Sequence, residues 1–217
     1  MINHPEPAYL MQTITDVPAG EEWLGPAERL VLWTLKFEKR RNDWRLGRWT
    51  AKCAIACWPG QSGKIKKLSD IEIMAAEDGA PEVTVVGKAV PINLSISHRE
   101  GVGCALITAP EVLPGCDLEI VEPRTLEFIS DFFTSGENKL VANAPQSDQP
   151  LMANLIWSAK ESAMKLLREG LRLDTHNVKV SFPNQTGVDG WKSLLVSIEP
   201  TGQQIRGWWL LKERVIL

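Results

Sequence analysis

Two long stretches with helical periodicity, each accompanied by short strand-like runs, constrain the fold of this chain more than any other feature. In residues 26–58, large apolar side chains recur at roughly helical spacing until a Pro-Gly pair ends the pattern, and a break near residues 42–43 would divide it into two helices. The second stretch, residues 151–168, is stopped by Gly170. Because each half of the chain offers helix and strands, we expect an α+β fold of two similar lobes with a cleft between them.

The expected strands are short, and Gly, Pro or Asp residues bound them. They fall at residues 83–86, 94–96, 103–108, 116–120, 178–182, 193–198 and 207–211, with helical segments between 126 and 142. A proline-containing stretch at residues 110–114 is typical of a linker, so we place the lobes at residues 1–112 and 113–217. No residue-level internal repeat is evident, so we expect any kinship between the lobes to be structural only.

Composition and charge argue against several classes of protein. The chain of 217 residues carries a formal net charge of −3 and a sequence pI near 5.7, which argues against a general nucleic-acid binder. It has no signal-peptide pattern and no run of about 18 uncharged apolar residues, so we expect a cytoplasmic protein that does not enter a membrane. The four cysteines lack the spacing of a zinc site, which predicts reduced thiols.

Asp117 and Glu119 are the first candidate functional residues. On a strand the side-chain period is two, so both carboxylates should project from one face while Cys116, Leu118 and Ile120 face the core. Two adjacent carboxylates repel each other, and a hard cation such as Mg2+ would relieve that repulsion. The alternative is an edge-strand pair of acids that water solvates.

A second candidate set lies on the helix predicted at residues 151–168. Trp157, Glu161 and Lys165 fall at positions i, i+4 and i+8, which places an acid and a base on one stripe. The neighbouring stripe is apolar, so Glu161 should lie near the margin of the core. The alternative is an ordinary Glu–Lys helix pair that contributes only a few tenths of a kcal/mol.

Together these two segments resemble the two-part signature of the phosphopantetheinyl transferase superfamily. Its usual form is a Gly-x-Asp-x-Glu strand and a Trp-Ser-x-Lys-Glu-(Ala/Ser)-x-x-Lys helix, which residues 115–119 and 157–165 match in order and spacing. Further segments resemble the family pattern at Arg40 and at residues 47–52, 87–88, 95–98 and 131–137. Ala89 and Arg99 depart from it, where proline and serine are usual. The chain length is similar to that of the two-lobed, surfactin-synthetase-activating (Sfp) type rather than the short trimeric type.

The resemblance implies an enzyme that transfers 4'-phosphopantetheine from coenzyme A to a serine of a carrier protein, with its active site in the cleft. It implies that Mg2+, or Mn2+, is held by Asp117, Glu119 and Glu161, and that Glu161 also acts as general base. Lys165 would contact the phosphates and stabilise the transition state. The coenzyme would be held by Lys165 together with Arg40, Arg48, Lys88, Ser97 and His98. Arg41, Arg45 and Lys52 have a weaker claim, because a charged surface explains them equally well.

The implied partner is an acidic acyl or peptidyl carrier protein, and the implied oligomeric state is a monomer. Residues 124–140, with Leu126, Phe128, Phe132 and Phe133, are the candidate docking surface, although these phenylalanines could equally fill the core. Two other functions remain open. One is a coenzyme A-binding regulator or hydrolase on the same scaffold, and the other is a non-enzymatic interaction module that binds an acidic partner through the tryptophans and the basic helix.

Overall fold

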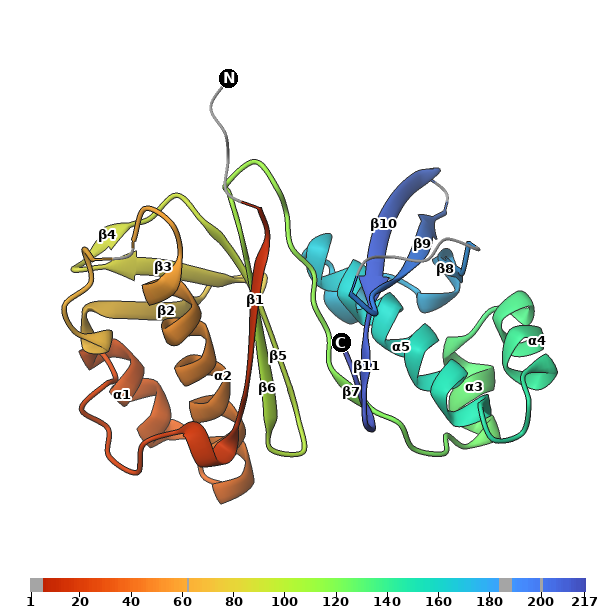
Figure 1. The fold of residues 1–217 in the computed structure, drawn as a ribbon, viewed down its shortest axis with the longest axis horizontal. Coiled ribbons are helices and arrows are strands. Elements are labelled where there is room, and N and C mark those ends of the chain that lie inside the picture. The colour runs from red at the N-terminus through yellow and green to blue at the C-terminus, as the bar shows by residue number, and fades with distance from the viewer. Residues whose placement is uncertain (1–5, 62, 184–188, 200) are drawn as a thin grey trace. The chain divides into compact units, whose positions relative to one another are not determined.

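The structure, a computed structural model, describes residues 6–61, 63–183, 189–199 and 201–217. The chain divides into two compact units, Met1–Cys116 and Asp117–Leu217 (Figure 1). Each unit contains helices and small antiparallel sheets, so the predicted α+β fold class is confirmed. The described helices are all too short or too polar to cross a lipid bilayer.

The first unit contains two three-stranded antiparallel sheets. One has the order β1-β6-β5 and the other the order β2-β3-β4. Their strands are β1 (Ala8–Thr13), β5 (Asn93–Arg99), β6 (Val102–Thr108), β2 (Ile71–Ala75), β3 (Pro81–Val85) and β4 (Lys88–Ala89). The structure confirms the strands expected near residues 83–86, 94–96 and 103–108, whereas β1 and β2 lie in segments for which we expected no strand.

Two helices pack in the first unit, α1 (Pro26–Thr34) and α2 (Glu38–Cys57), and α2 lies against β6 and β1. The expected break near residues 42–43 is wrong. Asp43 lies inside α2, where it pairs with Lys39 one turn earlier at 3.0 Å, and such a pair supports a continuous helix. The chain breaks instead at residues 35–37, where Leu35 and Phe37 have extended backbones.

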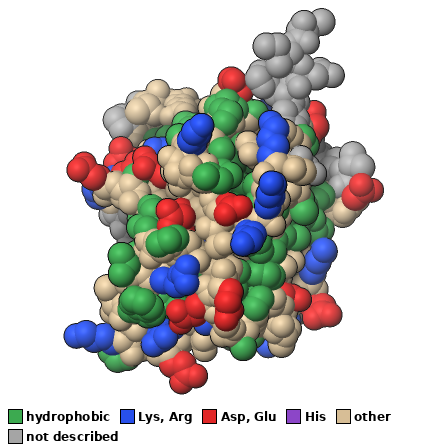
Figure 2. Space-filling view, turned by 90° about the vertical axis from the view of Figure 1, so that its left-hand side faces the viewer, with side chains coloured by type: hydrophobic (Ala, Val, Ile, Leu, Met, Phe, Trp, Pro, Cys, Tyr) green, Lys and Arg blue, Asp and Glu red, His purple; other side chains and the backbone are tan. Residues whose placement is uncertain are grey.

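The surface of the first unit holds several large apolar side chains from the stretch in which apolar residues recur at helical spacing. Leu30, Trp33 and Phe37 are 62%, 64% and 73% exposed. Figure 2 shows the face at the left-hand side of Figure 1, where hydrophobic side chains alternate with basic and acidic ones. The core of this unit is formed instead by residues of α2 and the strands, among them Ile55, Ile73 and Ile107.

The second unit contains two further antiparallel sheets, of order β11-β12-β7 and β10-β9-β8. Its strands are β7 (Glu119–Ile120), β8 (Val178–Ser181), β9 (Lys192–Ile198), β10 (Gln203–Trp209), β11 (Leu211–Lys212) and β12 (Val215–Ile216). Its helices are α3 (Leu126–Phe132), α4 (Ser135–Asn143) and α5 (Gln149–Leu166). The apolar side of α5, including Ile156 and Met164, packs in one core with Val178 and Val196 of the sheet.

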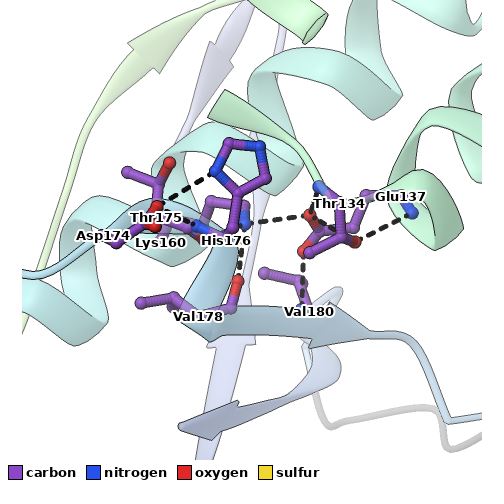
Figure 3. Close-up of polar contacts among 8 residues, drawn as sticks. All are labelled: Thr134, Glu137, Lys160, Asp174, Thr175, His176, Val178 and Val180. Carbon is purple, nitrogen blue, oxygen red and sulfur yellow. Dashed lines mark hydrogen bonds and ion pairs between the residues drawn. The ribbon is translucent and has the colours of Figure 1, made fainter. Parts of the chain in front are cut away.

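Each unit also holds a fully buried ion pair. In the first unit Lys52 of α2 pairs with Glu28 of α1, and both side chains are 0% exposed. The surface-charge interpretation of Lys52 is therefore wrong. In the second unit Lys160 of α5 pairs with Glu137 of α4 at 2.8 Å (Figure 3). Buried charges require a partner and further hydrogen bonds, and both lysines also donate to two backbone carbonyls.

The two buried lysines lie in similar short sequences. Residues 49–52 read Trp-Thr-Ala-Lys and residues 157–160 read Trp-Ser-Ala-Lys, each on the long helix of its unit. The match is only four residues long and one of them differs, so composition and periodicity do not distinguish it from chance. The equivalent ion pairs give the match its structural meaning.

Candidate active site

Three carboxylates converge in the second unit. Asp117 lies two residues before Glu119, which begins β7, and Glu161 lies on α5. Each residue offers one oxygen to a group whose ligand atoms all lie within 4.8 Å of one another. The strand and the helix that carry these residues also contact each other directly. This arrangement could hold a metal ion.

The strand that carries Asp117 and Glu119 is shorter than expected, because only Glu119–Ile120 pairs, with Ile216 opposite Glu119 on β12. The expected burial of Cys116, Leu118 and Ile120 is confirmed, at 6% exposed or less. The two acids are buried as well, at 3% and 5% exposed, so the solvated alternative is wrong. Buried carboxylates of this kind need nearby cations or protons.

Glu161 responds to this environment by holding its proton more tightly. Burial is the largest cause, the charge of Asp117 is the next, and together they raise the pKa of Glu161 from 4.5 to about 8, although the Lys165 charge opposes the shift. At neutral pH the carboxyl of the metal-free protein is therefore mostly protonated. A bound cation would favour the carboxylate form, because it replaces repulsion by attraction.

Two basic side chains already contact the cluster. Lys165 Nζ donates to Asp117 Oδ1 at 2.7 Å, and the lysine side chain remains 34% exposed. Arg124 donates to Glu119 Oε2 at 2.9 Å. Glu161 and Lys165, which we expected on one stripe of the helix, thus both lie beside Asp117 and Glu119. They do not form an isolated Glu–Lys pair.

Arg124 is the site residue that sequence reasoning missed, since we had placed it only in the candidate docking surface. Its guanidinium reaches Glu119 and also donates through Nε to Asn154 Oδ1 at 2.7 Å. Asn154 lies 30 residues away on α5, so neither helical nor strand periodicity could connect the two. A basic residue shortly after an Asp-x-Glu pair was the available signal.

The candidate coenzyme-binding residues other than Lys165 all belong to the first unit. Arg40 is exposed on the first turn of α2, and Lys88 is exposed on β4. Ser97 is buried on β5 while His98 is exposed, because neighbouring strand residues point to opposite faces. An added Cβ on Gly47 of α2 would lie 3.5 Å from the His98 ring, so α2 passes close to that imidazole.

Arg48 is the most unusual of these basic residues. It is half-buried on α2, and its guanidinium lies 5.0 Å from the centre of the Trp44 ring. Its Nε has no hydrogen-bond partner among the residues that the structure describes. Desolvation lowers the pKa of the Arg48 guanidinium, whereas the charge of Glu28 opposes that effect. A half-buried cation with an unpaired donor is suited to an anionic ligand.

Among the basic residues of α2 with the weaker claim, Arg45 donates to the backbone carbonyls of Pro18, Ala19 and Gly20, and Lys52 belongs to the buried ion pair. Both therefore have structural partners. Arg41 is only partly buried.

Only part of the candidate docking surface is exposed to solvent. Phe133 is 1% exposed, which overturns its assignment as a docking residue. Phe128 and Phe132 pack against the Trp157 ring, with centroids 5.1 and 5.0 Å from it. Leu126, at 82% exposed, remains available to a partner.

The solved structures that resemble part of this chain include holo-acyl-carrier-protein synthases from three organisms described below. The protein from Bacillus anthracis str. Ames, in complex with CoA (3',5'-ADP), shares 24% identity over 48% of this chain and 93% of its own, with a TM-score of 0.41. The Helicobacter pylori protein, in complex with coenzyme A, shares 19% identity over 48% and 98%, with a TM-score of 0.38. The Thermotoga maritima protein shares 19% identity over 61% and 76%, with a TM-score of 0.37.

Comparison with curated proteins gives no match to this chain. A family model does match, over a segment that contains β7, α3, α4, α5 and β8. The segment includes Asp117, Glu119, Glu161 and Lys165, so the whole carboxylate cluster lies inside it. Residues 114–191 of this chain thus match the model of the 4'-phosphopantetheinyl transferase superfamily.

Proposed function

We propose that this protein transfers the 4'-phosphopantetheine group of coenzyme A to a serine of an apo acyl or peptidyl carrier protein, with release of 3',5'-ADP. The convergence of Asp117, Glu119 and Glu161 within a segment that matches the superfamily model carries this proposal. The alternative function, a coenzyme A-binding regulator without catalysis, accounts for the carboxylate cluster less well. Coenzyme binding alone needs no buried group of three acids.

The donor set fits Mg2+ or Mn2+. All three side chains offer carboxylate oxygens, which hard divalent cations prefer, and a bound cation would offset the burial and the Asp117 charge that raise the pKa of Glu161. Asp117, Glu119 and Glu161 would hold the ion. When bound, it would supply charge neutralisation for the diphosphate and for the oxygen that leaves.

Glu161 is the proposed general base. Its carboxylate accepts the proton of the carrier serine hydroxyl as the serine oxygen forms a bond to the β-phosphorus of coenzyme A. The bond between that phosphorus and the bridging oxygen breaks, and 3',5'-ADP leaves with the electron pair. A serine hydroxyl is a weak nucleophile unless a base accepts its proton, and Glu161 must be ionised to do so. The Lys165 charge, which lowers the pKa of Glu161, favours that state.

Lys165 and the basic residues of the first unit would hold the substrate. Lys165 is one-third exposed and could exchange its contact with Asp117 for one with a phosphate. Coenzyme A carries a diphosphate and a 3'-phosphate, for which Arg48, with its unpaired Nε, is a suitable ligand. We assign the same role to Arg40, Lys88, Ser97 and His98.

We further propose the two-lobed Sfp type, acting as a monomer. Two compact units, each with a long helix and an equivalent buried Lys–Glu pair, support this assignment. The carrier partner is acidic and would meet Leu126 together with basic residues of the second unit.

The decisive experiment combines the protein with coenzyme A, Mg2+ and a panel of apo-carrier proteins from fatty-acid and peptide synthesis. Mass spectrometry should show that a carrier gains the mass of one phosphopantetheine group. Glu161→Gln should abolish the gain yet keep most coenzyme A binding. Glu169→Gln is the matched control, because Glu169 is half-exposed and pairs only with Arg172 at 3.7 Å in the described structure. Release of free phosphopantetheine without any carrier modification would favour a hydrolase instead.

A further inference from the structure

The Arg124 side chain joins two residues that lie far apart in the sequence. Its terminal nitrogen donates to Glu119 Oε2 at 2.9 Å and its Nε donates to Asn154 Oδ1 at 2.7 Å. The guanidinium plane is also covered by the Phe128 ring, whose centroid lies 4.8 Å away. With only 13% of the side chain exposed, Arg124 is held in one orientation.

Asn154 is built to hold that orientation. It is 0% exposed, and its side-chain amide donates to the carbonyls of Glu122 and Pro150 at 2.6 and 2.7 Å while its oxygen accepts from Arg124. A buried amide with partners on both ends has a fixed geometry, because rotation would leave polar atoms unsatisfied. The same amide therefore fixes the loop before α3 and the arginine on that loop.

Asn154 and Glu161 lie seven residues apart on α5, about two turns of one rigid helix. The helix thus carries one candidate metal ligand directly. Through Asn154 and Arg124 it also holds a second ligand, Glu119, which belongs to the strand β7. The distance between the carboxylates of Glu119 and Glu161 then depends on this chain of hydrogen bonds as well as on backbone pairing.

We propose that Arg124, oriented by Asn154, is a positioning residue that fixes the Glu119 carboxylate for metal binding. The inference rests on the proposed metal site and goes beyond it, because it assigns the geometry of that site to two residues that do not touch the ion. A carboxylate has two oxygens, so Glu119 can bind Arg124 through Oε2 and still offer the other oxygen to a cation.

The charge of Arg124 and its hydrogen bonds have opposite effects on the affinity of the site for a cation. A guanidinium near the site repels a divalent ion, so removal of its charge would tighten binding. Loss of its hydrogen bonds would let Glu119 move, and loss of such outer contacts typically weakens metal binding by about 10–100-fold. A test of positioning must therefore keep the positive charge in place.

Arg124→Lys and Asn154→Leu both keep that charge. Lysine lacks the planar fork that reaches two acceptors at once, and leucine has a similar shape to asparagine but cannot accept from Arg124 Nε. The measurement is the Mn2+ dissociation constant of the metal-free protein, from the electron paramagnetic resonance signal of free Mn2+, with no substrate present. Arg172→Lys is the matched control, since Arg172 is exposed and contacts only Glu169 and the Arg168 carbonyl in the described structure.

We expect Mn2+ binding to weaken by about 10-fold or more in both variants and to stay within about twofold in Arg172→Lys. Circular dichroism establishes that each variant is folded, and if Asn154→Leu fails to fold, Arg124→Lys alone decides. Unchanged Mn2+ affinity in folded Arg124→Lys would overturn the positioning role while leaving the transferase proposal intact. If the parent protein binds no Mn2+, both the metal site and this inference fall.

Discussion

The two compact units have equivalent buried ion pairs, but only in the second is the buried lysine followed in the sequence by an acid. Glu28 and Glu137 are each the third residue of a short helix. One carboxylate oxygen of each accepts a hydrogen bond from the backbone N–H of the residue that precedes the helix, Gly25 at 2.9 Å and Thr134 at 2.8 Å. Their other oxygens accept from Ile73 of β2 and Val180 of β8, at 3.1 and 2.8 Å. The ion pair thus joins two helices and a strand within each unit (Figure 3 shows the second).

The residue that follows the buried lysine differs between the units. Cys53 follows Lys52, whereas Glu161 follows Lys160. Each of these side chains lies near a residue on or next to the first strand of its unit, Cys53 near Gln12 and Glu161 near Asp117. We call the buried Lys–Glu pair and its hydrogen bonds the shared frame. The comparison teaches that this frame is a property of the fold, whereas the chemistry of each unit depends on a few residues that differ between them.

The largest expected effect comes from breaking the shared frame. Lys52→Met and Lys160→Met should each lower the free energy of unfolding by about 3–5 kcal/mol, because each leaves a buried glutamate without its cation. Urea denaturation measures the change. Lys39→Met is the control on α2, since the Lys39 side chain is 84% exposed and its pair should contribute about 1 kcal/mol or less. A small effect in one unit only would show that the two frames are not equivalent.

The next effect concerns pH and only the second unit. The pKa of Glu161 is about 8 when folded and near its ordinary 4.5 when unfolded, so between these values the folded state keeps a proton that the unfolded state has lost. Stability of the metal-free protein should therefore fall as pH rises from about 4.5 to about 8, then level off. Thermal melts in chelator measure this decline.

Glu161→Gln should remove that decline, since glutamine does not titrate. Cys53→Ser should leave it unchanged, because burial raises the pKa of the Cys53 thiol above 9.0 and the group stays protonated throughout this range. An unchanged decline in Glu161→Gln would assign it to another group.

A smaller effect compares the close contacts of two glycines. An added Cβ on Gly103 of β6 would lie 2.8 Å from Leu46 Cγ on α2, and on Gly207 of β10 it would lie 2.7 Å from a terminal methyl of Leu194. The branch carbon of a fully buried leucine cannot rotate away, whereas a methyl can. Gly103→Ala should thus cost about 1–3 kcal/mol in urea denaturation, and Gly207→Ala less. The reverse order would contradict this account of α2 packing.

The smallest expected effect is on metal stoichiometry. Cys53→Glu places an acid after the buried lysine of the first unit, but Gln12 beside it offers no carboxylate. We expect Mn2+ titration of the variant to give the same stoichiometry as the parent, because a hard cation needs several charged oxygen ligands. A second bound Mn2+ would show that the buried ion pair together with one added acid is sufficient for metal binding.

Local patterns predicted much of the fold. Alternation and turn residues located β5, β6, β8 and β9, and helical periodicity located α5 to within about two residues. The strands β1, β2 and β12 were missed, and two of them, β1 and β12, pair with strands far away in the sequence, β6 and β7. The strand β12, at the C-terminal end, pairs with β7 and so supports Glu119.

The sequence by itself determined which acids share a face, because strand and helix periods are properties of the backbone. Asp117 and Glu119 follow the strand period, and Glu161 and Lys165 follow the helix period. Only the tertiary structure decided that Lys52 is buried, that Arg124 contacts both Glu119 and Asn154, and that burial raises the pKa of the Glu161 carboxyl. Burial and long-range hydrogen bonds arise between segments far apart in the chain, and no local period encodes them.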